Sequence, residues 1–93
     1  MITRDELSNA KHLWQSAHDS ATLAHECWRL LIESRKALIE SYRQAGFPFT
    51  EATREFEKLM EDHAERYQNA LTQMDEMGKA YAELLEQFKK ASD

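Results

Sequence analysis

Gly46-Phe47-Pro48-Phe49 is the stretch that decides the fold of this 93-residue chain, because it separates two long and regular hydrophobic repeats. The whole chain contains two glycines and one proline, and one of each lies here. Pro48 disfavours a helical conformation at Phe47, and Gly46 is suited to the left-handed conformation that ends many helices. This stretch therefore predicts a turn between two helices.

On both sides of the turn, mostly apolar residues recur at alternating spacings of three and four. The first series contains Leu7, Ala10, Trp14, Ala17, Ala21, Ala24, Trp28, Leu31, Arg35, Leu38, Tyr42 and Ala45, and the second contains Phe56, Met60, His63, Tyr67, Ala70, Met74, Met77, Tyr81, Leu84, Phe88 and Ala91. This spacing gives a helix one apolar face. It predicts an all-α fold, a long antiparallel, coiled-coil-like hairpin forming one domain over residues 1–93, with helices at about 4–45 and 51–91 and a turn at 46–50.

The expected helix limits rest on capping residues. Thr3 and Glu6 have the spacing of a capping box, so the first helix should begin near residue 4. Thr50 is the expected cap of the second helix.

If the turn is centred between Phe47 and Pro48, residue i lies opposite residue 95 minus i. This register places Gly78 beside Ala17, and we interpret the glycine as a point of close backbone approach, with a hinge as the alternative. It also pairs aromatic residues across the hairpin: Trp14 with Tyr81, and Trp28 with Tyr67.

The first helix also carries a second uncharged stripe next to the one that faces its partner helix. The predicted protein interface on this stripe consists of Leu13, Ser16, Ser20, Leu23, Cys27, Leu30, Ser34 and Ala37. The two stripes together form an uncharged arc wider than one neighbouring helix can cover. We therefore expect a homodimeric four-helix bundle with the first helix of each chain at its centre. A different protein covering the same stripe is the alternative.

Two positions of the repeats that are expected to face the other helix, here called inner positions, carry polar residues, namely Arg35 and His63. The register places Arg35 near Met60 and within reach of Glu57 or Glu61, where it would fix the helix pairing. A functional arginine finger is the alternative. His63 is expected to pack at the seam, and a pH switch is the alternative reading. Both residues are candidates for controlling register.

Phe47 and Phe49 are apolar residues at the exposed end of the hairpin. They are expected to fold back and close the end of the bundle. The alternative is a partner-docking tip.

The charge distribution is unequal. The net charge is −5, and residues 50–93 carry the whole excess, with eleven acidic and six basic side chains. An acidic surface repels phosphate backbones, so nucleic-acid binding is disfavoured. The single cysteine excludes an internal disulfide, and neither a membrane-spanning run nor a signal peptide is evident. We expect a cytoplasmic protein, with signal-independent export as an alternative.

No constellation of residues predicts catalysis, a cofactor or a metal site. His18 and His25 are about 10 Å apart along a helix, too far to share one ion. The preferred function is a non-enzymatic protein-protein interaction module, namely an adaptor, a secretion chaperone or an inhibitor of a basic target. The alternatives are a structural scaffold protein and a nucleic-acid-associated protein that uses the row Arg29, Lys36 and Arg43.

Overall fold

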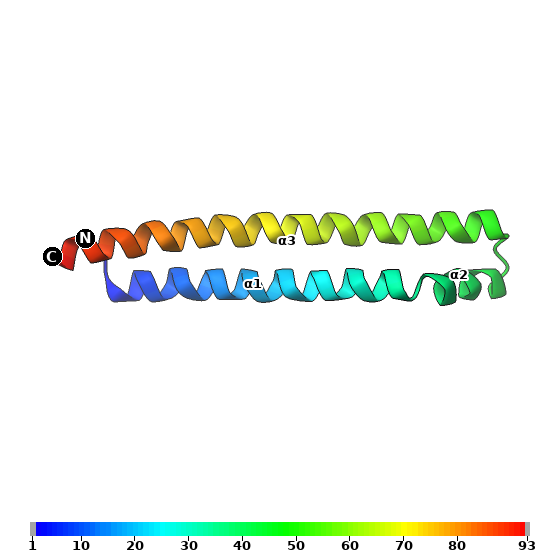
Figure 1. Ribbon diagram of the computed structural model, residues 1–93, viewed down its shortest axis with the longest axis horizontal. Helices are drawn as coiled ribbons and strands as arrows, with labels where there is room; N and C mark the ends of the chain where they lie inside the picture. Colours follow the sequence, from blue (N-terminus) through cyan, green and yellow to red (C-terminus); the bar gives the residue numbers. More distant parts are fainter. Residues whose placement is uncertain (1, 93) are drawn as a thin grey trace. The chain divides into compact units, whose positions relative to one another are not determined.

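The computed structural model describes residues 2–92, without the side chain of Ser92, and these residues form three α-helices. Helix α1 spans Arg4–Glu33, α2 spans Arg35–Gln44 and α3 spans Phe49–Ser92 (Figure 1). The predicted all-α fold is confirmed. Internal contacts divide the chain into two compact units, Met1–Thr22 with Asn69–Asp93, and Leu23–Gln68.

Helix α1 begins where the capping residues predict. The Glu6 backbone N–H donates to the Thr3 hydroxyl at 3.1 Å, and the Leu7 N–H donates to the Thr3 carbonyl at 3.1 Å. Asp5 and Glu6 also place negative charge in the first turn, where the helix dipole favours it. The predicted start near residue 4 is confirmed.

In the first unit, α1 and α3 pack through aromatic rings and small residues. The rings of Trp14 and Tyr81 stack with centroids 6.3 Å apart, as the predicted register requires. The expected partner of Gly78, Ala17, is wrong. A Cβ atom at Gly78 would lie 3.1 Å from Trp14 Nε1 and 3.2 Å from Trp14 Cδ1. Gly78 therefore makes room for the Trp14 indole, and Ala17 is not the group that requires it.

In the second unit, the predicted register is found both at the end farthest from the turn and close to the turn. Trp28 and Tyr67 stack with ring centroids 6.0 Å apart. The core of this unit is formed by three buried residues, Ile39, Ala52 and Phe56, against which Leu31, Leu38, Tyr42 and Met60 pack.

The predicted single helix over 4–45 is interrupted at Ser34. This residue has φ −91° and ψ 5°, outside the helical range, although its N–H still donates to the Leu30 carbonyl at 2.9 Å. Beyond the interruption Ile39 is 5% exposed, whereas Arg35 is exposed. The Arg35 guanidinium lies 5.7 Å from the centre of the Phe56 ring, so Arg35 lies beside α3 without being buried there. A straight α-helix drifts by about 20° per heptad from a strict seven-residue repeat, and burying a guanidinium is costly, so both effects favour Ile39 at the inner position.

The end of α2 is a complete Schellman motif. Gly46 has φ 104°, its N–H donates to the Arg43 carbonyl at 3.0 Å, and the Phe47 N–H donates to the Tyr42 carbonyl at 3.1 Å. The apolar contact typical of this motif is also present, because the Phe47 ring packs edge-on against the Tyr42 ring with centroids 5.7 Å apart. The predicted helix stop at Gly46 is confirmed.

Helix α3 begins two residues before the predicted residue 51. The Ala52 N–H donates to the Pro48 carbonyl at 2.8 Å, so Pro48 precedes the first helical residue and Thr50 already lies within the first turn. The expectation that Thr50 caps α3 is therefore wrong. Proline suits this boundary because its fixed φ is compatible with the start of a helix.

Candidate protein-interaction surface

The outer face of α1 in the second unit exposes large apolar side chains. Leu23 is 66% exposed and Leu30 is 48% exposed, and Cys27 between them is also exposed. Their spacing of four and three residues places them on one side of the helix. We call these three residues the Leu–Cys face.

The other predicted interface residues are exposed as well. In the first unit Leu13 is 47% exposed, and Ser16 and Ser20 are exposed beside it in sequence. In the second unit Ser34 and Ala37 are exposed, although the interruption at Ser34 separates them from α1. Scattered exposed apolar residues are common, whereas several on one face indicate an interaction site.

Sequence reasoning missed Ile32, a further exposed apolar residue of α1. It lies two residues from Leu30, which is a rotation of about 200° around a helix at 100° per residue. Ile32 therefore belongs to another side of α1 than the Leu–Cys face. In the sequence, only a helical wheel, which gives the position of Ile32 around the helix, could have pointed to this residue.

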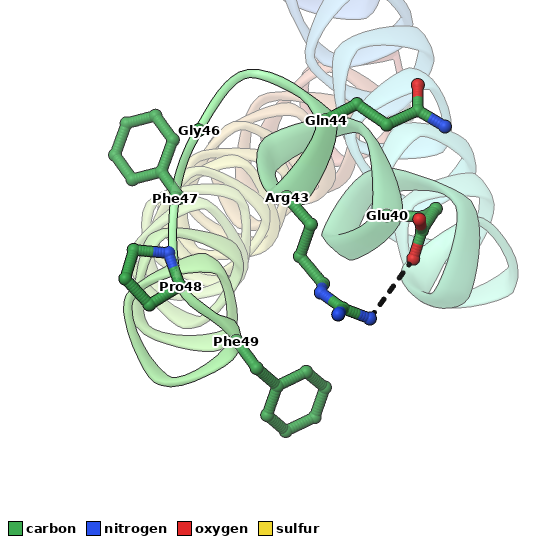
Figure 2. A pocket seen from close by; sticks show the side chains of 7 residues that line it. All are labelled: Glu40, Arg43, Gln44, Gly46, Phe47, Pro48 and Phe49. Atoms are coloured by element: carbon green, nitrogen blue, oxygen red, sulfur yellow. Dashed lines mark ion pairs between the residues drawn. The ribbon is translucent and has the colours of Figure 1, made fainter.

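The turn carries a hollow that combines apolar and charged groups (Figure 2). It is lined by Glu40, Arg43, Gln44, Gly46, Phe47, Pro48 and Phe49. Figure 2 shows the rings of Phe47 and Phe49 projecting to different sides of the turn.

The two phenylalanines of the turn have different surroundings. Phe47 is 38% exposed and rests on Tyr42, whereas Phe49 is 60% exposed. The Arg43 guanidinium lies 5.9 Å from the centre of the Phe49 ring and also pairs with Glu40 at 3.5 Å. Phe47 thus contributes to the helix stop, while Phe49 is the more accessible of the two candidate tip residues.

The two candidate register residues lie in the second unit and differ in burial. Arg35 is exposed, and its guanidinium lies 5.7 Å from the centre of the Phe56 ring, a cation–π geometry. His63 is half-buried on α3. Arg35 therefore touches the core cluster from outside it.

An aromatic cluster in the second unit contains a polar group without a partner among residues 2–92. The His25 ring lies 5.2 Å from the Tyr67 ring and 6.5 Å from the Trp28 ring, measured between centroids. The Trp28 indole nitrogen is buried, and within this part of the chain it has no hydrogen-bond acceptor. A buried N–H without an acceptor costs about 1 to 3 kcal/mol.

The row of basic residues proposed for nucleic-acid contact is largely paired with carboxylates. Arg29 bonds to Glu26 and to Glu33, the latter at 2.5 Å, and these carboxylates raise the pKa of its guanidinium. The hydrogen bond from Arg29 also lowers the pKa of Glu26 below its usual value. Pairing of Arg43 with Glu40 further reduces the positive charge available to a phosphate backbone.

Most acidic residues of α3 are exposed, although Glu55 is half-buried, and some of them form local ion pairs. Asp75 pairs with Lys79 at 2.9 Å and raises the pKa of the lysine, and Glu55 pairs with Lys58 at 3.4 Å. Glu61, Asp62, Glu65 and Glu76 are also exposed.

Two kinds of site are not found within residues 2–92. No three His, Cys, Asp or Glu side chains in this range gather closely enough to hold a metal ion. No helix in the described part of the chain has both the length and the apolar character needed to cross a membrane.

Comparison with known proteins adds no family assignment: no family model, curated protein or solved structure matches this chain.

Proposed function

We propose that the chain is a non-enzymatic protein-protein interaction module that docks through the outer face of α1. The observation that carries this proposal is the exposure of three leucines on α1, which are between 47% and 66% exposed. Covering such residues stabilises a complex by about 25 cal/mol per Å² of apolar area.

The preferred partner is a second copy of the chain. A homodimer would form a four-helix bundle in which the two α1 helices are central and the two α3 helices are outside. Leucine next to serine and alanine suits this arrangement, because small side chains allow helices to approach closely.

The exposed acidic positions of α3 support an adaptor, a secretion chaperone or an inhibitor of a basic target. In the proposed bundle these carboxylates would face outward and remain available. Binding of a basic target would then weaken steeply with added salt, because screening acts on exposed charges.

Mass measurement in solution tests the preferred partner. The wild-type chain is expected to have the mass of two chains, and the double substitution Leu23→Ser/Leu30→Ser should raise the dissociation constant at least about a hundredfold. Both leucines are exposed, so helix content measured by circular dichroism should not change.

Ile32→Ser is the matched control, because Ile32 is 44% exposed on the same helix but outside the Leu–Cys face. This variant should remain a dimer. A wild-type chain that stays monomeric at high micromolar concentration would overturn the homodimer, and equal weakening by Ile32→Ser would move the interface elsewhere on α1.

A further inference from the structure

A hollow of about 380 Å³ lies beside the Trp14 indole in the first unit. Four residues of α1 line it, namely Trp14, Gln15, His18 and Asp19. Its volume falls within the range of about 300 to 1,000 Å³ that is typical of ligand sites. The hollow combines aromatic rings, a side-chain amide and a carboxylate, and aromatic rings and carboxylates are the groups that bind organic cations.

Packing between α1 and α3 holds the indole of the hollow in place. The Trp14 ring stacks on Tyr81 with centroids 6.3 Å apart, and its Nε1 edge lies against Gly78, where a Cβ atom would be 3.1 Å away. The His18 ring lies 6.0 Å from the Trp14 ring, measured between centroids, with an angle of 51° between the two planes. The two rings of the hollow are therefore tilted walls and do not cover each other by stacking.

The carboxylate of the hollow is accessible to a ligand. The Asp19 side chain is 87% exposed, and its Oδ1 lies 3.9 Å from His18 Nδ1. This contact is an ion pair only when the histidine is protonated. When His18 is neutral, it does not compensate the negative charge of Asp19, and the hollow favours a cation over an anion.

We propose that this hollow binds the guanidinium group of an arginine side chain that belongs to a basic protein partner. A guanidinium is planar, so it stacks on aromatic rings, and it donates two parallel hydrogen bonds to a carboxylate. Trp14 supplies the aromatic surface and Asp19 supplies the carboxylate. The Gln15 side-chain oxygen accepts a further hydrogen bond.

The hollow lies on a different side of α1 from the predicted interface residues of the first unit. His18 is two residues from both Ser16 and Ser20, which is a rotation of about 200° at 100° per residue. A second copy of the chain on the side of Ser16 and Ser20 would therefore leave the hollow open. The inference rests on the proposed function only in naming a basic partner, whereas binding of an isolated arginine peptide requires neither a dimer nor that partner.

Nuclear magnetic resonance of the ¹⁵N-labelled chain tests the hollow by titration with a glycine-arginine-glycine peptide whose two ends are blocked. The titration is done at about pH 8, above the range in which histidine ordinarily titrates. The indole N–H resonance of Trp14 reports on the hollow, and that of Trp28, whose indole nitrogen is buried in the other unit, is the internal reference. The same peptide with citrulline in place of arginine has nearly the same shape and no charge, so it is the control ligand.

We expect the arginine peptide to move the Trp14 resonance until it saturates and to leave the Trp28 resonance in place. Asp19→Asn removes the charge of the carboxylate and should raise the dissociation constant of the peptide about threefold, as the loss of an exposed ion pair does. Because Asp19 is mostly exposed, the helix content of this variant should not change. Glu76→Gln is the matched control, since it removes an exposed carboxylate of the same unit outside the hollow, and it should bind the peptide as the wild type does.

A Trp14 resonance that does not respond to the arginine peptide would overturn the proposal. Equal responses of the two indoles, or equal binding of the citrulline peptide, would also overturn it, because neither result requires a guanidinium in the hollow. Equal weakening by Asp19→Asn and Glu76→Gln would attribute the binding to net charge and contradict a site at Asp19. The mass of the chain in solution tests the homodimer separately, so its failure is distinguishable from a failure of the hollow.

Discussion

The two units of the molecule accommodate bulky side chains in different ways. In the first unit, the Trp14 indole fits against α3 because Gly78 has no Cβ atom, and the helical backbone continues. In the second unit, the backbone of the first hydrophobic series is interrupted at Ser34, and Ile39 turns toward Phe56. The first unit accommodates its bulky residue through the absence of a side chain at Gly78, and the second through a change of backbone conformation at Ser34. The stability of the first unit should therefore respond to changes of side-chain volume, and that of the second to changes in which residues face α3.

The largest effect is expected from Phe56→Ala, which removes the central ring of the second unit's core. Phe56 is buried, and such substitutions cost about 3 kcal/mol or more in the free energy of unfolding. Chemical denaturation would measure this loss. Phe49→Ala is the matched control because that ring is mostly exposed, and a similar loss there would show that the turn, not the cluster, holds α2 against α3.

Gly46→Ala should have the next largest effect, and it acts on the backbone alone. A Cβ atom at Gly46 would meet nothing within 4 Å, but φ 104° is strained for alanine. The expected cost is about 1 to 2 kcal/mol in unfolding free energy. A neutral result would mean that the Schellman motif at the end of α2 is not required.

Gly78→Ala tests the opposite behaviour in the first unit. Alanine favours a helix over glycine by about 1 kcal/mol, but here the new methyl would press against the Trp14 indole. We expect Gly78→Ala to raise the free energy of unfolding by clearly less than this value in the wild-type background. In a Trp14→Leu background it should raise the free energy of unfolding by the full value. A thermodynamic cycle over the four variants measures the difference. Equal effects in both backgrounds would remove the indole as the reason for glycine.

Much of the first unit follows from the sequence, because its inner positions carry no charge. The Thr3 cap and the pairing of Trp14 with Tyr81 required only local chemistry and a turn position. The same reasoning found Gly46 as the helix stop.

The second unit departs from the sequence pattern where a repeat position falls on Arg35. A heptad count treats every position equally and ignores both the drift of a straight helix and the cost of a buried charge. The exposure of the Leu–Cys face could be anticipated from the helical wheel, but the identity of a partner could not, since apolar area carries no information about partner identity.

The smallest expected effect concerns the surface ion pairs of α1. Their contribution to stability should not depend on how either unit accommodates its bulky side chains. The hydrogen bond from Arg29 lowers the pKa of Glu26, so this carboxylate stabilises the folded state above its unfolded pKa of about 4.5. That contribution is lost as pH falls through the lower folded value. Glu26→Gln should therefore lower the melting temperature slightly at pH 7, and the difference from wild type should disappear on acidification below the folded pKa. Because both partners are exposed, added salt should also reduce the difference at pH 7. A difference that persists in acid would mean that Glu26 acts through packing against its neighbours and not through its charge.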